Sequence, residues 1–208
     1  MSEFSDLVWR AGRRIIDGHM LCAERVLHLG HYALQSAALP GAYAEFGCFG
    51  GNTAAFLCRL TGKPIHLFDS FTGLPAPVAQ DADPIFSAGC FSIGEVEVLK
   101  CFEQSGLPQP IIHRGFFSEV NPEEVPALAF AHLDGDLYTS ILDSLRLVYP
   151  KLLPGAAAVV DDYGWERLSG VKAACDDFFS DKPEKCAALA MTGGNHQGFF
   201  IKGSVAQQ

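Results

Sequence analysis

Four aspartates that follow two apolar stretches are the residues of this chain with the clearest chemical use. The stretch AHLDGDLY runs from a predicted strand into Asp134 and Asp136, and AAAVVDDYG ends in Asp161 and Asp162. In open α/β sheets, ligands bind beyond the carboxyl ends of the strands, where these carboxylates would lie. An all-oxygen ligand set favours Mg²⁺, Ca²⁺ or Mn²⁺ over zinc or copper. We therefore predict that Asp134, Asp161 and Asp162 hold a hard divalent metal such as Mg²⁺.

The adjacent pair Asp161 and Asp162 sets a condition on this site. Neighbouring residues of a strand point to opposite faces, so both can meet one ion only if the strand ends there, which Tyr163-Gly164 permits. Packed together without a cation, these carboxylates would raise at least one pKa by repulsion. For a single aspartate the alternative is a structural role, since Asp136 precedes a predicted helix and could cap it. For both clusters together we favour the metal.

A glycine-rich turn, EFGCFGGNTA (45–54), follows the first predicted strand and opens a helix. Glycine lets the backbone turn tightly and approach a ligand, and the helix N-terminus at Asn52-Thr53 offers N–H groups to a carboxylate or phosphate. The turn is not the dinucleotide-binding fingerprint, because Phe49 stands at the second glycine of that motif, and it lacks the P-loop lysine. Alone, it fits a turn without a ligand equally well.

A further carboxylate, Asp69 in LFDSFTGLP, ends the second predicted strand, 24 residues after Glu45. An acid at this place can accept both hydroxyls of a ribose. The alternative is that Asp69 caps Ser70 or the turn. Its spacing from the glycine-rich turn favours the ribose.

The rest of the chain predicts a sheet that would bring these residues together. Short apolar stretches alternate with amphipathic helices, which is typical of a mostly parallel, doubly wound α/β sheet. The last two strands are joined by a short turn and predict an antiparallel hairpin at one edge. The predicted strands are 42–47, 64–69, 111–114, 128–133, 156–161, 186–191 and 199–201. The predicted helices are 4–38, which Gly18 can divide, 52–60, 95–104, 118–125, 139–152 with Thr139 or Ser140 as its cap, and 168–179.

The 208 residues are predicted to form one domain, 1–208, with an N-terminal helical segment over 1–40. A long loop rich in proline and glycine spans 70–93. Compact domains rarely carry such a loop without a use, so we predict a lid over a substrate. N-terminal helices can pair subunits, which leaves a homodimer open.

The composition argues against several classes of protein. The net charge of −9 and the pI of about 5.1 disfavour a nucleic-acid partner. The seven cysteines are odd in number and show no CxxC spacing, so we predict free thiols in a reducing cytosol and no zinc site. Neither a secretory leader nor an apolar stretch of about 18 residues is evident, so we predict a cytoplasmic protein without membrane contact.

Several motifs carry a resemblance to a known family. EFGCFGGNTA, FDSFTGLP, GCFSIGEVEVLKCF, LDGDLYTS followed by YPKLLPGA, and VVDDYG occur in that order. Together they resemble the macrocin O-methyltransferase (TylF-type) family over roughly residues 40–180. The resemblance implies a class I, Rossmann-like methyltransferase domain that uses S-adenosylmethionine and Mg²⁺. It also implies methyl transfer to a hydroxyl of a small molecule, such as a sugar of a natural product.

The resemblance also implies roles for individual residues. The glycine-rich turn would hold the methionine part of S-adenosylmethionine, Asp69 its ribose, and segment 114–119 its adenine. Asp134, Asp161 and Asp162 would hold Mg²⁺. The residues expected to bind the cofactor are Glu45, Gly47, Phe49, Gly51, Asn52, Thr53, Asp69, Ser70, Ser118 and Asp134.

The residue expected to act as general base differs from that of the catechol O-methyltransferases. Leu137 stands where catechol O-methyltransferases, whose glycine turn is similar, carry a lysine. The expected catalytic base is therefore Asp134 or Asp136, which would take the hydroxyl proton as the methyl group is displaced in line.

Residues outside these motifs have less specific expectations. His196 and Gln197 are expected in a surface turn, and His113 is expected to pack at its strand. Trp165 and Tyr138 fit either a wall of the acceptor pocket or ordinary core and surface positions.

Other functions fit the same residues less well. One is a non-catalytic protein that binds S-adenosylmethionine, which would not need three converging carboxylates. Another is a metal-dependent hydrolase on a similar sheet, which would not bind S-adenosylmethionine. An NAD-dependent oxidoreductase is disfavoured because the fingerprint is absent. The sequence does not identify the methyl acceptor.

Overall fold

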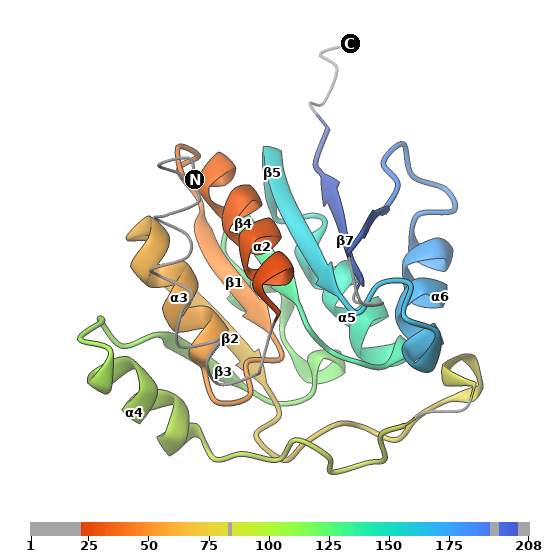
Figure 1. The fold of residues 1–208 in the computed structure, drawn as a ribbon, viewed down its shortest axis with the longest axis horizontal. Coiled ribbons are helices and arrows are strands. Elements are labelled where there is room, and N and C mark those ends of the chain that lie inside the picture. Colours follow the sequence, from red (N-terminus) through yellow and green to blue (C-terminus); the bar gives the residue numbers. More distant parts are fainter. Residues whose placement is uncertain (1–21, 83–84, 192–195, 204–208) are drawn as a thin grey trace.

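A seven-stranded sheet forms the centre of the molecule in the computed structural model, which describes residues 22–82, 85–191 and 196–203. The strand order is β3-β2-β1-β4-β5-β7-β6 (Figure 1). The strands are β1 (Ala42–Phe46), β2 (Ile65–Asp69), β3 (Ile111–Arg114), β4 (Leu128–Leu133), β5 (Leu152–Asp161), β6 (Ala187–Ala190) and β7 (His196–Ile201).

The first five strands run parallel, and β7 pairs antiparallel with both β5 and β6. This confirms the predicted doubly wound sheet with a C-terminal hairpin. The chain order reverses between β1 and β4, which is the switch point where such sheets bind ligands. The hairpin differs in extent, because β7 begins at His196 rather than at 199.

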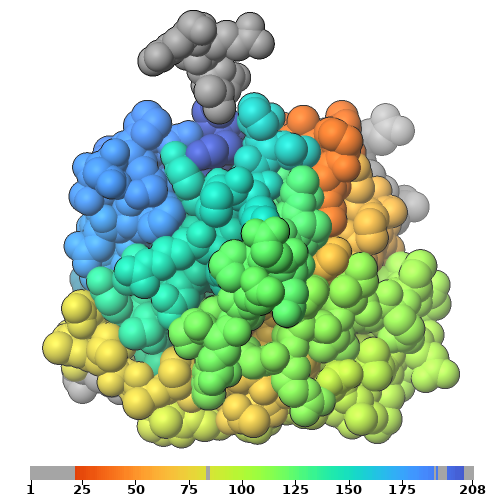
Figure 2. All heavy atoms as spheres, turned by 180° about the vertical axis from the view of Figure 1, so that it is seen from behind, coloured from red at the N-terminus to blue at the C-terminus, as the bar shows by residue number. Residues whose placement is uncertain are grey.

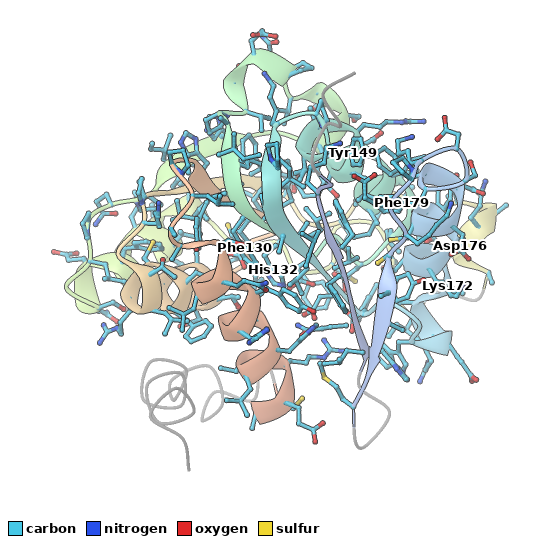
Figure 3. The ribbon with its side chains drawn as sticks, turned by 90° about the horizontal axis from the view of Figure 1, so that it is seen from above. Phe130, His132, Tyr149, Lys172, Asp176 and Phe179 are labelled. Atoms are coloured by element: carbon cyan, nitrogen blue, oxygen red, sulfur yellow. The ribbon has the colours of Figure 1, made fainter. Side chains whose placement is uncertain are left out.

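Helices cover both faces of the sheet. They are α2 (Ala23–Ser36), α3 (Asn52–Thr61), α4 (Glu95–Gln104), α5 (Tyr138–Val148) and α6 (Ser169–Phe178). Helices α2 and α3 lie on one face and α5 and α6 on the other (Figures 1 and 3). Successive residues of β4 point to opposite faces of the sheet. Phe130 packs in the core beneath α2 and α3, and Ala131 packs in the core beneath α5 and α6. Of the predicted helix 4–38, the part up to residue 21, with Gly18, lies outside the described residues.

The start of α5 was predicted incorrectly. Neither Thr139 nor Ser140 caps this helix, because its N-cap is Leu137. The carboxylate of Asp81 instead accepts a hydrogen bond from the Tyr138 backbone N–H at 2.8 Å. A side chain from a distant loop therefore replaces the local cap.

Two other elements differ from their predicted extents. Strand β5 begins at Leu152 rather than at 156, because a bulge with Gly155 at a φ of +83° lets the chain pass Pro154-Gly155 without leaving the sheet. The predicted helix 118–125 is two short 3₁₀ turns, η2 (Phe117–Glu119) and η3 (Pro122–Glu124). Proline lacks the N–H that a continuous helix would need there.

Residues 70–82 and 85–93 run along the carboxyl ends of the parallel strands, at the base of the molecule (Figures 1 and 2). They contain one 3₁₀ turn, η1 (Ala79–Asp81), and a further turn, η4 (Glu166–Leu168), precedes α6. All seven cysteines are free, as predicted. Among the described residues, no helix is both long enough and apolar enough to traverse a lipid bilayer.

Candidate active site

A cavity of about 520 Å³ opens at the carboxyl ends of β1, β2, β4 and β5. Its size is within the range of small-molecule sites. One part of its wall is aromatic and is formed by Phe49, Phe86, Phe91, Phe116, Phe117 and Trp165. Another part is charged and is formed by Arg25, Asp69, Asp134, Asp136, Asp161 and Asp162. The cavity therefore joins an apolar surface to a cluster of carboxylates.

The glycine turn after β1 packs directly against the loop after β4. Gly47 has a φ of +88°, and a Cβ atom added there would lie 2.0 Å from the carbonyl oxygen of Asp134. Only glycine fits this close approach. The backbone N–H of Asp134 also donates to the carbonyl of Phe46 at 2.8 Å. The turn and the carboxylate loop are thus held as one unit.

The carboxylate of Asp69 organises the same turn. Its Oδ2 accepts hydrogen bonds from the backbone N–H groups of Cys48 at 2.9 Å and Phe49 at 3.2 Å. Its Oδ1 accepts one from Phe71 at 2.8 Å. A carboxylate has about four lone-pair directions, so one is left for a ligand. Asp69 therefore holds the turn in place, which was the alternative to ribose binding, and it also lines the cavity. Its contact with a ribose stays a prediction.

The residues predicted to bind the cofactor fall into two groups. Gly47, Phe49, Asp69, Ser70 and Asp134 line the cavity. Glu45, Gly51, Asn52, Thr53 and Ser118 are not part of the described cavity wall. Ser118 is exposed, although its neighbours Phe116 and Phe117 do line the cavity.

Asp161 and Asp162 converge at the end of β5. The strand ends at Asp161, and Asp162 has a φ of +56°, which turns its side chain back toward its neighbour. Both carboxylates reach the guanidinium of Arg25, from Asp161 Oδ2 at 3.2 Å and from Asp162 Oδ1 at 2.5 Å. The strand therefore ends where the sequence predicted, and this end lets the two side chains converge. The bound metal stays a prediction.

The donor atoms fit a hard divalent cation. Carboxylate oxygens of Asp134, Asp136 and Asp162 lie within 4.8 Å of one another, and so do ligand atoms of His132, Asp134 and Asp161. Asp134 belongs to both sets. Oxygen donors gathered this closely are the ligands that Mg²⁺ or Ca²⁺ takes.

Burial and mutual repulsion raise the pKa values of three carboxyl groups in the cluster. Burial, together with the charges of Asp162 and Asp161, raises the pKa of Asp136 to about 8. Burial and the charge of Asp161 raise the pKa of Asp162 to about 6, against the effect of Arg25. Burial, then Asp161 and Asp136, raises the pKa of Asp134 well above its usual value. A bound cation would relieve this repulsion.

A buried polar network lies beneath the carboxylates, on the face of the sheet that α2 covers. His132 and Glu45 are register partners on β4 and β1, and His132 Nδ1 lies 2.8 Å from Glu45 Oε1. His132 Nε2 lies 4.0 Å from Asp161 Oδ2 and has no hydrogen-bond partner among the described residues. Figure 3 shows His132 and Phe130 beside α2, whereas Tyr149 and Phe179 lie toward α6.

The network includes residues that the sequence did not reveal. Gln197 was expected in a surface turn, which is wrong: it is fully buried in β7, and its Nε2 donates to Asp161 Oδ1 at 2.6 Å. Its Oε1 lies 2.8 Å from His28 Nδ1. Arg25 and His28 sit one helical turn apart on α2, a spacing that could have suggested one functional face.

Three remaining expectations can be placed. His113 packs at its strand as predicted, with its ring stacked on Phe68 at 4.2 Å between centroids. Trp165 lines the cavity. The Tyr138 hydroxyl donates to Asp177 at 2.9 Å, on the outer surface.

Comparison with curated proteins finds O-methyltransferases. The chain is 29% identical over 168 residues to 8-demethyl-8-(2,3-dimethoxy-alpha-L-rhamnosyl)-tetracenomycin-C 4'-O-methyltransferase of Streptomyces olivaceus, covering 73% of this chain and 61% of that one. It is 30% identical over 142 residues to demethyldecarbamoylnovobiocin O-methyltransferase of Streptomyces niveus, covering 60% and 53%. It is 26% identical over 164 residues to mycinamicin III 3''-O-methyltransferase of Micromonospora griseorubida, covering 69% and 64%. The chain thus spans less than two thirds of the length of these relatives.

Solved structures and a family model complete the comparison. The O-methyltransferase NovP superposes with a TM-score of 0.71 at 21% identity, covering 88% of this chain and 81% of that one. The calicheamicin methyltransferase CalS11 gives 0.70 at 17% identity, covering 98% and 94%. At these identities the likeness establishes a shared fold. The model of the family described as Macrocin-O-methyltransferase (TylF) matches residues 8–187, most of the sequence. The chain therefore belongs to the macrocin O-methyltransferase (TylF) family.

Proposed function

We propose that this protein is an S-adenosylmethionine-dependent and Mg²⁺-dependent O-methyltransferase that acts on a hydroxyl of a small molecule. The observation that carries the proposal is the meeting, in one cavity, of the glycine turn after β1, Asp69 after β2, and the carboxylates after β4 and β5. Family membership supports the same reaction.

The methyl donor would lie along the glycine turn. Backbone N–H groups at the start of α3, with Asn52 and Thr53, would take its carboxylate, and Asp69 and Ser70 would take its ribose. The segment with Phe116, Phe117 and Ser118 would flank its adenine. S-adenosylmethionine, when bound, would supply a methyl group from its sulfonium, and these residues would hold the donor in the cavity that the carboxylates also line.

The acid cluster would hold the acceptor and take its proton. Mg²⁺ would be held by Asp134, Asp161 and Asp162. Asp134 and Asp162 form one close group of ligand atoms with Asp136, and Asp134 and Asp161 form another with His132. The ion, when bound, lowers the pKa of a hydroxyl that it contacts. Asp134 or Asp136 would accept the proton that the hydroxyl loses. Holding both reactants in this geometry could contribute roughly 7–11 kcal/mol to the lowering of the barrier.

The acceptor that we propose is a sugar hydroxyl of a larger natural product. Three relatives are named as O-methyltransferases of a rhamnosyl tetracenomycin, a demethyldecarbamoylnovobiocin and mycinamicin III. The aromatic part of the wall, with Phe86, Phe91 and Trp165, would cover the apolar body of such a molecule.

A metal-removal assay tests the proposal. Methyl transfer from S-adenosylmethionine to a panel of glycosides and phenols should disappear after treatment with a chelator and return with Mg²⁺. Asp161→Ala should lose both the turnover and the response to Mg²⁺, whereas Asp143→Ala, on the outer side of α5, should keep both. Turnover that survives complete removal of metal would rule out the metal role.

A further inference from the structure

Arg25 places a positive charge inside the acidic cluster. It lies in the first turn of α2 and is only 9% exposed, and Asp161 and Asp162 are 2% and 8% exposed. Its Nη1 lies 3.2 Å from Asp161, and its Nη2 donates to Asp162 at 2.5 Å. One guanidinium thus bridges two carboxylates that come from the end of β5. Such pairs are strong because the planar group presents parallel donors.

Helix α2 is attached to the sheet by more than this bridge. Val26, Leu29 and Ala33 are fully buried in the core of that face. His28, one turn after Arg25, reaches Asp161 through Gln197. Asp161 is therefore held at one oxygen by Gln197 and at the other by Arg25. Loss of the guanidinium contact would leave the rest of the helix in place.

The charges around the cavity do not balance. Arg25 supplies one positive charge to a cluster of four carboxyl groups, those of Asp134, Asp136, Asp161 and Asp162, so the cluster has an excess of negative charge whenever more than one of them is ionised. A divalent cation that entered the cluster would lie close to the guanidinium and be repelled by it. It would also compete with the guanidinium for the same oxygens of Asp161 and Asp162.

We propose that Arg25 is a built-in counter-cation, which holds Asp161 and Asp162 in position while no ion is bound and is released from them when Mg²⁺ binds. This inference rests on the proposed function, because it takes these carboxylates to be the metal ligands. Arg25 is a positioning residue in this account. Because energetic coupling is reciprocal, Mg²⁺ binding loosens the first turn of α2, and α2 in its docked position weakens Mg²⁺ binding.

Two measurements on the metal-free chain test the proposal, and neither needs a substrate. Calorimetric titration with Mg²⁺ should give a tighter affinity for Arg25→Gln than for wild type, by a factor in the range of about 5 to 150 that is usual for such coupling. Arg25→Lys, which keeps the charge but cannot bridge two carboxylates, should lie between them. Arg146→Gln, which removes an exposed arginine paired with Asp143 on α5, should match wild type.

Hydrogen exchange supplies the second measurement. In wild type, Mg²⁺ should speed exchange in the first turn of α2 and slow it at 134–138 and 161–163. In Arg25→Gln only the slowing should remain. If wild type binds no Mg²⁺, the proposed metal site fails, whatever Arg25 does. If wild type binds Mg²⁺ but Arg25→Gln binds it no more tightly, or α2 does not respond to the ion, the counter-cation proposal is overturned and the metal site stands.

Discussion

The backbone conformation and the surroundings of Asp136 are both unusual for an aspartate. The residue has a φ of +59°, a conformation that aspartate tolerates better than most side chains, and it faces two other carboxylates. A carboxylate in such surroundings is stabilised by a bound cation or by protonation. The burial and repulsion that favour the proposed metal should also make the metal-free chain sensitive to pH.

We expect the metal-free protein to become less stable as the pH rises. The pKa of Asp136 is raised by burial and by the charges of Asp162 and Asp161, from 3.8 to about 8. Because the folded state binds this proton more tightly than the unfolded state, protonation of Asp136 stabilises the fold. This contribution is complete below the unfolded-state pKa of 3.8 and is lost as the pH rises through the folded-state pKa of about 8. The free energy of unfolding should fall over that window, by at most about 1.4 kcal/mol per pH unit for one group.

Urea unfolding in the presence of a chelator measures this dependence. Asp136→Asn should flatten the fall in the free energy of unfolding, and Asp143→Asn should leave it as in wild type. Saturating Mg²⁺ should also flatten it, because the ion favours the ionised carboxylates. A metal-free protein whose stability is constant over this pH range would show that the cluster is less crowded than described here.

At the scale of elements, the segment from 70 to 93 is fastened to the helix that follows the carboxylate loop. Asp81 is 3% exposed, and its Oδ1 caps α5 at Tyr138 while its Oδ2 accepts from the backbone of Val78 at 2.8 Å. Gly170 of α6 is needed beside it, since an added Cβ would lie 2.0 Å from Asp81 Oδ1. The loop predicted as a lid is thus anchored by Asp81 to the start of α5.

Removal of this anchor should have a local effect. Asp81→Ala should lower the free energy of unfolding by about 1 kcal/mol, as for the loss of a helix cap, and should speed amide exchange at 138–142. Asp81→Asn keeps an oxygen acceptor and should retain most of the stability. Exchange at the start of α5 that is the same in Asp81→Ala and wild type would mean that the helix does not depend on this cap.

At the scale of the whole molecule, the parts predictable from sequence are those with local signals. Apolar stretches and turns gave the sheet, the hairpin and the carboxylates at the strand ends. The contact of Arg25 with Asp162 joins residues 137 positions apart, and that of Gln197 with Asp161 joins residues 36 apart. The cap by Asp81 likewise acts from 57 positions away. No local pattern encodes these contacts, because each joins residues of α2, β7 or the loop to residues that are distant in the sequence.

We propose above all that the cavity at the switch point binds S-adenosylmethionine beside the carboxylates. The most direct measurement is a calorimetric titration of the chain with S-adenosylhomocysteine, with NAD as the control ligand. We expect saturable binding of S-adenosylhomocysteine, one molecule per chain, and no binding of NAD. Absence of S-adenosylhomocysteine binding, with or without Mg²⁺, would contradict it.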